Sequence, residues 1–132
     1  KIIHRDLKPS NILLASDGED PIIKVADFGY ARFLESTQLA ETACGTPLYM
    51  APEVFRNKKY DAKADLWSVG CILYEMITGS VPYTGKSQVD LFENIQTQNL
   101  SFPTDVSPNC RVIFFFFFFF GNGNNTFLLI FL

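Results

Sequence analysis

The chain has 132 residues and a formal net charge of −3, and this length allows one domain at most. Its basic residues never form a run longer than Lys58–Lys59, whereas binding to nucleic acid or to a membrane surface needs a concentrated basic face. The three widely spaced cysteines, Cys44, Cys71 and Cys110, form no C-x-x-C pair. That spacing is typical of reduced thiols rather than of disulfides or a metal site. The totals therefore argue against a nucleic-acid binder, a membrane-surface binder and a redox or zinc protein.

Two short strands joined by a turn are predicted first along the chain. Asn11–Ala15 and Pro21–Val25 are apolar runs, and the segment S-D-G-E-D between them is typical of a turn. Residues 30–50 have no hydrophobic period and contain Ser, Thr, Gly and Pro. This stretch predicts a long, mobile loop.

A strongly apolar helix is predicted after the loop, ending at Gly79. One of its faces would carry Ala64, Trp67, Cys71, Tyr74 and Thr78, with Ile72, Leu73, Met76 and Ile77 beside it. We expect such a helix to be buried nearly all round.

A second helix is predicted to begin near Ser87. Ser87 and Asp90, three residues later, resemble a capping box. Val89, Phe92 and Ile95 would form the inner edge of this helix.

The composition changes after Cys110, where seven consecutive phenylalanines, a Gly/Asn spacer and a short apolar end follow. Val112–Phe120 holds nine apolar residues and Phe127–Leu132 holds six, whereas a helix needs about 20 to cross a bilayer. No membrane span is therefore predicted. A homopolymer has no amphipathic period, so it predicts no packed element.

The chain is accordingly divided into residues 1–110, which look globular, and residues 111–132, a low-complexity apolar tail. We expect this tail to be translated non-coding sequence, such as a T-rich retained intron. If it is made, it is an aggregation hazard.

Three short motifs that carry chemistry follow one another in a fixed order. The first, His4-Arg5-Asp6-Leu7-Lys8-Pro9-Ser10-Asn11, fits the H-R-D-L-x-x-x-N catalytic loop of protein kinases. Asp27-Phe28-Gly29 follows an apolar strand, and Ala51-Pro52-Glu53 closes the predicted loop. Each triplet alone recurs by chance, but the three in this order rarely do. Residues 1–110 therefore resemble the eukaryotic protein kinases, from the catalytic loop to the helix after the activation segment.

The resemblance implies a protein kinase-like α+β fold, of which this chain is a fragment of the mainly α-helical large lobe. It also implies a catalytic set for transfer of the γ-phosphoryl group of ATP, a reaction that depends on positioning and charge neutralisation. Asp6 would accept the proton of the substrate hydroxyl. Lys8 would supply positive charge near the phosphoryl group, and Thr46 would bond to both side chains.

The same resemblance implies a nucleotide and metal site. Asn11 and Asp27 would bind Mg²⁺ ions that bridge the phosphates. Leu13 would lie under the adenine ring, with Asp27 also on the nucleotide side.

Five further residues are expected to have structural roles. His4 would pack in the core, Phe28 would serve packing rather than chemistry, and Gly29 would be structural. Asp65 would cap the apolar helix, anchor the backbone of the catalytic loop, or do both. Glu53 would pair with an arginine from a region that this sequence does not contain.

Specificity and regulation also follow from the resemblance. Lys8-Pro9, with G-T-P-L-Y-M-A-P-E after it, resembles serine/threonine rather than tyrosine kinases, and Tyr30 favours serine over threonine. Thr42 matches the usual activating phosphorylation site. A phosphate there adds about −2 charge, and Arg5 and Arg32 are the candidates to receive it. The alternative is an unmodified loop threonine.

Within the kinases, Leu39-Ala40-Glu41-Thr42 and Tyr60-Asp61-Ala62-Lys63-Ala64-Asp65 look most like the autophagy-initiating serine/threonine kinases. The runner-up is a calcium/calmodulin-dependent or energy-sensing kinase. The first resemblance implies ATP and Mg²⁺ as cofactors, protein substrates and autophagy regulatory subunits that bind other regions. It also implies a cytoplasmic protein that is recruited to pre-autophagosomal membranes.

The resemblance covers only the centre of a kinase. A Gly-rich phosphate loop, the strand lysine and its glutamate partner would precede Lys1, and further large-lobe helices would follow Cys110. We therefore expect weak ATP binding and negligible activity for the isolated chain. A non-catalytic truncated fragment that binds partners is the alternative function. The intact set Asp6, Lys8, Asn11 and Asp27 favours the enzyme.

Overall fold

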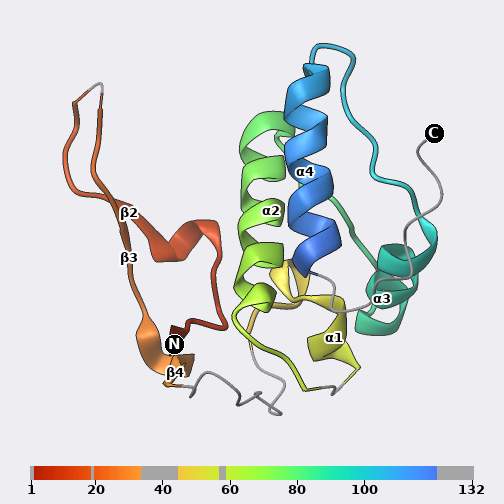
Figure 1. The fold of residues 1–132 in the computed structure, drawn as a ribbon, viewed down its shortest axis with the longest axis horizontal. Helices are drawn as coiled ribbons and strands as arrows, with labels where there is room; N and C mark the ends of the chain where they lie inside the picture. Colours follow the sequence, from red (N-terminus) through yellow and green to blue (C-terminus); the bar gives the residue numbers. More distant parts are fainter. Residues whose placement is uncertain (1, 19, 34–44, 57–58, 122–132) are drawn as a thin grey trace.

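Helix α2 (Lys63–Thr78) is the element against which much of the chain packs (Figure 1). The structure, a computed structural model, describes residues 2–18, 20–33, 45–56 and 59–121. Two two-stranded antiparallel sheets lie in the N-terminal part. The helices follow in chain order: α1 (Pro52–Phe55), α2, α3 (Gln88–Thr97) and α4 (Pro108–Gly121).

The predicted strand pair is confirmed as an antiparallel hairpin of β2 (Ile12–Leu14) and β3 (Ile23–Val25). Ile12 is opposite Val25 and Leu14 is opposite Ile23. The hairpin projects away from the helices (Figure 1), and its apolar side chains are largely exposed. No other element that the structure describes covers these side chains of the hairpin.

A second strand pair joins the beginning of the chain to the segment after the D-F-G motif. Strand β1 (Ile2–Ile3) pairs with β4 (Arg32–Phe33), with Ile3 opposite Arg32. β4 and the 3₁₀ helix η3 (Pro47–Tyr49) lie within the stretch predicted as one long loop. Residues 34–44, most of that loop, lie outside the described residues.

Helix α2 has the predicted extent, and Gly79 ends it. Gly79 has a φ of 75°, which favours glycine, and its N–H donates to the carbonyl of Glu75 over 2.8 Å. The predicted inner face is confirmed for Ala64, Trp67, Cys71 and Tyr74, which are buried. The expected burial all round is wrong, because Leu66, Met76 and Ile77 are 42%, 73% and 47% exposed. Among the described residues, the core and α4 cover one side of α2, and these three side chains face away from it.

Helix α3 begins after Ser87, as predicted. The Ser87 hydroxyl accepts the backbone N–H of Asp90 over 3.1 Å, so it satisfies one otherwise unpaired donor at the helix start. The predicted inner edge is partly wrong: Leu91 and Ile95 are buried, whereas Val89 is 75% exposed. Leu91 and Ile95 are four residues apart and share a face, while Val89, two residues before Leu91, points elsewhere.

Helix α4 contradicts the expectation that the phenylalanine run forms no packed element. Phe114 is 1% exposed, and its ring lies edge-on to Tyr74 at 5.7 Å. Phe118, four residues later, lies edge-on to Trp67 at 4.7 Å. A Cβ built on Gly70 would lie 2.8 Å from the Cβ of Phe117, so this glycine permits the close approach of α4. The phenylalanine run has no hydrophobic period. Its contacts with α2 therefore decide which of its side chains are buried.

Helix α4 is also the most apolar of the helices, but it is short. At 14 residues it is about 21 Å long, against about 30 Å for the hydrocarbon core of a bilayer. No helix in the part of the chain that the structure describes is long and apolar enough to cross a membrane. The tail residues 122–132 lie outside that part.

Candidate active site

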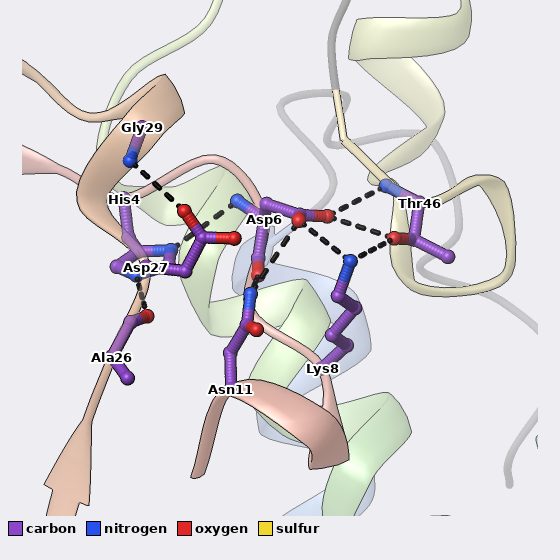
Figure 2. A network of polar contacts seen from close by, with 8 residues as sticks. All are labelled: His4, Asp6, Lys8, Asn11, Ala26, Asp27, Gly29 and Thr46. Atoms are coloured by element: carbon purple, nitrogen blue, oxygen red, sulfur yellow. Dashed lines mark hydrogen bonds and ion pairs between the residues drawn. The ribbon is translucent and has the colours of Figure 1, made fainter.

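The carboxylate of Asp6 is the centre of a polar network near the start of the chain (Figure 2). Asp6 is buried, with 4% of its surface exposed. Its Oδ1 accepts two hydrogen bonds from Thr46, from the backbone N–H over 2.9 Å and from the hydroxyl over 2.8 Å. Its Oδ2 lies 2.8 Å from the ammonium of Lys8. Both carboxylate oxygens are therefore held by donors from two separate segments.

Lys8 closes this network, because its ammonium also donates to the Thr46 hydroxyl over 3.1 Å. Burial by itself would raise the pKa of Asp6. Hydrogen bonds from Lys8 and Thr46 and the charge of Lys8 outweigh that effect, so the pKa of Asp6 lies below its usual value. The hydrogen bond to Asp6 raises the pKa of Lys8. At neutral pH the two groups therefore form an ion pair.

The local chain path brings Asn11 back to Asp6. Lys8 is extended, and Pro9 begins the 3₁₀ helix η1 (Pro9–Asn11), where its fixed φ suits the first position. The Asn11 side chain is buried, and its Nδ2 donates to the carbonyl of Asp6 over 2.8 Å and approaches Oδ2 at 3.4 Å. Because the amide nitrogen is used on Asp6, the amide oxygen remains as the atom that can bind a cation.

Asp27 reaches the same region from the end of β3. The N–H of Ala26 donates to the carbonyl of Asn11 over 2.8 Å, which joins the two strand ends. Asp27 has a left-handed backbone with a φ of 60°, and its Oδ1 accepts the N–H of Gly29 over 3.2 Å. Figure 2 shows its carboxylate near the side chains of Asp6 and Asn11. One Asp27 oxygen and the Asn11 amide oxygen form a hard oxygen set that suits Mg²⁺, which takes few protein ligands alongside phosphates.

His4 and Phe28 pack behind the network. The His4 ring is buried and lies edge-on to Phe28 at 4.9 Å. Its Nε2 lies 3.0 Å from the carbonyl of Ala26, and the N–H of Asp6 approaches its Nδ1 at 3.3 Å. The tautomer with hydrogen on Nε2 satisfies both contacts. His4 thus connects the catalytic-loop motif to the segment that carries Asp27, whereas Phe28 stays 57% exposed.

Asp65 binds the backbone of the catalytic-loop motif. Its Oδ2 accepts the N–H of His4 over 2.8 Å, and its Oδ1 accepts the N–H of Arg5 over 3.0 Å. Asp65 lies in the first turn of α2, and the cap position belongs to Ala62, whose side chain makes no cap. Of the two roles weighed for Asp65, the structure therefore has the anchor and not the cap.

The residues predicted to regulate the site are only partly described. Thr42 lies outside the described residues. Arg5 donates from Nε to the carbonyl of Tyr30 over 2.5 Å, and its guanidinium approaches the Tyr60 hydroxyl at 3.4 Å. Arg32 lies on β4 and is paired with Ile3. Ile3 precedes Arg5 by two residues along the chain. The two arginines therefore come from paired neighbouring segments.

Leu13 and Glu53 are not among the residues whose contacts hold Asp6. Leu13 is on β2 and is 50% exposed, within the uncovered hairpin. Glu53 lies in the first turn of α1, and its Oε2 is buried without a hydrogen-bond partner among the described residues. Burial raises the pKa of Glu53 to about 7, and the nearby Asp61 adds to this shift. The arginine partner that the kinase resemblance implies for Glu53 stays a prediction.

Gly45 and Ser68 also contribute to the site, and the sequence did not predict them. Gly45 has a φ of 110°, and a Cβ on it would lie 2.4 Å from the carbonyl oxygen of Arg5. Only a glycine lets the chain pass this close and bring Thr46 onto Asp6. Ser68 on α2 donates to the carbonyl of Tyr49 over 2.8 Å. Neither residue has a signal in a single sequence, because a glycine in a predicted loop and a serine in a helix are both common.

The buried carboxylate of Asp6 is held by Lys8, and Asn11 and Asp27 come from the same region. This arrangement is suited to phosphoryl transfer. Comparison with known families agrees. The chain belongs to the protein kinase domain family, which it matches over residues 1–114. The expected kinase-like fold class is confirmed.

Comparison with individual proteins indicates which protein kinases this chain is similar to. The chain is 56% identical over 114 residues to the serine/threonine-protein kinase ATG1b of Arabidopsis thaliana, a match that covers 83% of this chain and 16% of the relative. It is 50% identical over 111 residues to the serine/threonine-protein kinase atg1 of Dictyostelium discoideum, covering 84% of this chain and 17% of the relative. The expected resemblance to the autophagy-initiating kinases is confirmed. The chain spans between 14% and 18% of the length of such relatives.

Proposed function

We propose that the complete protein containing this segment transfers the γ-phosphoryl group of ATP to serine or threonine residues of protein substrates, in autophagy initiation. The observation that supports this best is the carboxylate of Asp6, held by Thr46 and Lys8 at hydrogen-bond distance. The serine/threonine kinase names of the relatives support the class of acceptor. They also favour this family over a calcium/calmodulin-dependent or energy-sensing kinase.

In the proposed reaction Asp6 orients the substrate hydroxyl and accepts its proton. The lowered pKa keeps this carboxyl ionised at neutral pH, so it can accept a hydrogen bond from the hydroxyl. Oδ1 already accepts two short bonds from Thr46, while Oδ2 accepts Lys8 at 2.8 Å and Asn11 only at 3.4 Å. The substrate hydroxyl would therefore replace the long contact at Oδ2. Lys8 would stay on the same oxygen and offset negative charge on the phosphoryl group.

Asn11 and Asp27 are the residues that would hold Mg²⁺, through the amide oxygen and the second carboxylate oxygen. When bound, Mg²⁺ neutralises charge on the β- and γ-phosphates. The Gly29 N–H and the Asp6 carbonyl fix the orientation of these two side chains, so both are arranged before a cation arrives.

The test is a phosphoryl-transfer assay on the complete protein with ATP, Mg²⁺ and a protein acceptor. Asp6→Asn should lower kcat by about 10² or more, because general-base help is worth about 10²–10⁴. Asp27→Asn should raise the Mg²⁺ concentration needed for half-maximal rate. Asp17→Asn, in the exposed turn of the hairpin, is the matched control and should leave both quantities unchanged. Equal turnover by the wild type and Asp6→Asn would refute the proposal.

The division of the chain at residue 110 remains a prediction, as does the non-coding origin of residues 111–132. The family match reaches residue 114, and α4 packs on α2. Sequencing of the mature transcript decides the question: a message that omits the phenylalanine codons supports the intron, and one that retains them refutes it.

A further inference from the structure

Ser68 is a buried polar residue on the otherwise apolar inner face of α2. It is 7% exposed and lies between the buried residues Ala64 and Cys71 on this helix. Its hydroxyl lies 2.8 Å from the carbonyl oxygen of Tyr49 and 3.3 Å from that of Ala64. A hydroxyl has one hydrogen to donate, and the shorter bond leaves the helix. The bond to Ala64 would have been enough to satisfy a buried hydroxyl, so the contact with Tyr49 needs another explanation.

The partner of Ser68, Tyr49, is connected to Asp6 through Thr46. Tyr49 ends η3, and its N–H donates to the carbonyl of Thr46 over 3.0 Å. Thr46 in turn gives both of its donors to Asp6 Oδ1. A short chain of hydrogen bonds therefore runs from α2 through Tyr49 and Thr46 to the carboxylate.

Helix α2 also holds the other side of Asp6. Asp65 accepts the backbone N–H groups of His4 and Arg5, which immediately precede Asp6. Asp65 and Ser68 are three residues apart and so lie on the same face of the helix. One turn of α2 thus contacts two segments, the His4–Arg5 backbone and η3. The distance between these segments decides where the Asp6 carboxylate lies.

A second contact holds the same tyrosine. The Tyr49 hydroxyl donates to Glu75 Oε2 over 2.7 Å. Ser68 and Glu75 are seven residues apart, which is about two turns of one helix face. Tyr49 is therefore held on α2 at its backbone and at the end of its side chain, so its orientation along the helix is fixed.

We propose that Ser68 is a positioning residue for Asp6, acting through Tyr49 and Thr46. This inference rests on the proposed kinase function, for which Asp6 is the proton acceptor. The hydroxyl sets the distance between η3 and α2, and so sets where the two Thr46 donors meet Asp6. Loss of the hydroxyl leaves the fold in place but lets η3 move, which misaligns the carboxylate and slows transfer.

The experiment uses Ser68→Ala in the complete protein. We expect kcat to fall about five- to tenfold, the order of effect of one neutral hydrogen bond, with the KM for ATP within twofold of wild type. Amide hydrogen exchange of residues 46–50 should become faster. Ser68→Thr keeps the hydroxyl beside a small pocket that Arg5 and Tyr60 also line, and it should restore kcat. Cys71→Ala, one turn further along the buried face, is the control for lost packing and should change neither kcat nor exchange at residues 46–50.

A double-mutant cycle tests the route through Thr46. In a Thr46→Ala background, which keeps only the backbone N–H donor to Asp6 Oδ1, Ser68→Ala should lower kcat by a smaller factor than it does in the wild type. Independent, multiplying effects of the two substitutions would overturn the inference, as would an unchanged kcat or unchanged hydrogen exchange in Ser68→Ala. If wild type and Asp6→Asn are equally slow, the kinase function fails and so does the catalytic part of this inference, while exchange at residues 46–50 still reports the contact.

Discussion

Asp65 accepts the backbone N–H of Arg5 over 3.0 Å, and Arg5 has a φ of 71°. A non-glycine residue in the left-handed region costs about 1 kcal/mol or more and persists only where the surroundings hold it. Here the same carboxylate also binds the N–H of His4. The turn that presents Asp6 is therefore held by a side chain some sixty residues further along the chain.

Asp65→Asn should destabilise the complete protein by about 2–3 kcal/mol, because hydrogen bonds to a charged group contribute about 1.5–3 kcal/mol each. The asparagine side chain keeps one acceptor oxygen. Its NH₂ group would face one of the two backbone N–H donors that Asp65 binds, so that donor would lose its hydrogen bond. Urea denaturation measures the effect, with Glu93→Gln on the exposed side of α3 as the control. Equal midpoints for the two variants would contradict the anchoring role.

Gly45→Ala should lower kcat by about tenfold or more, because a Cβ there lies 2.4 Å from the Arg5 carbonyl oxygen and the φ of 110° disfavours a side chain. The chain must shift, and the Thr46 N–H moves with it from Asp6. Gly18→Ala is the matched control, since nothing lies within 4 Å of its Cβ. Steady-state kinetics that fail to separate these two alanines would show that the close approach is unimportant.

Phe114→Ala should destabilise residues 1–132 by about 3–5 kcal/mol, the usual cost of emptying a fully buried phenylalanine site. Phe115→Ala, one residue along the run but 43% exposed, should cost much less. Thermal or urea denaturation of both variants measures the difference. If the two substitutions had the same effect, α4 would not be packed on α2 in the register described.

The pH dependence of stability should contain a contribution from Glu53. Its native pKa of about 7 lies above the ordinary 4.5, so between these values the folded chain binds more protons than the unfolded chain. The contribution of Glu53 to stability is therefore greatest at the acid end of this window and falls as the pH rises from 4.5 toward 7. A shift of one pKa unit corresponds to about 1.4 kcal/mol. The contribution of Glu53 to the free energy of unfolding therefore falls by a few kcal/mol across this window.

Glu53→Gln should remove this contribution from residues 1–132. The free energy of unfolding, measured from pH 4.5 to pH 7.5, should fall less steeply than in the wild type. Asp61→Asn keeps Glu53 and should retain most of the slope. A wild type whose stability stays constant or rises across this window would contradict the raised pKa.

Thr42→Ala should lower the activity of the complete protein sharply if a phosphate on Thr42 orders the activation loop by recruiting Arg5 and Arg32. Thr42 lies outside the described residues, so this prediction depends on the sequence motif alone. Activity before and after phosphatase treatment is the measurement, with Thr37→Ala, a second threonine of the same loop, as control. Unchanged activity in Thr42→Ala would leave an ordinary loop threonine.

The sequence predicted the hairpin, α2 and the start of α3 because each has a local signal: paired apolar runs, an apolar helix before Gly79, and the Ser87 cap. The motif residues Asp6, Lys8, Asn11 and Thr46 were predicted as a group and do meet in one network.

The features that could not be predicted from the sequence alone depend on the surface against which each helix packs. Val89 and Leu91 are equally apolar, and only the packing of α3 decides that Leu91 is the buried one. The phenylalanine run has no period, so its helix and its buried residues come from Trp67, Gly70 and Tyr74 on α2. The raised pKa of Glu53 likewise comes from burial that no local pattern records.

The uniform composition of α4 has a consequence for the length of the run. The rings that contact the aromatic residues of α2 belong to Phe114, which is buried, and to Phe118, which is partly buried, while the phenylalanines continue to Phe120. Deleting one or two phenylalanine codons would draw later ones forward and leave phenylalanine at both positions, whereas a third deletion would bring Gly121 to position 118. Repeat-length variants up to that limit would therefore share one core, and natural variation in the count would be structurally silent until the limit is crossed.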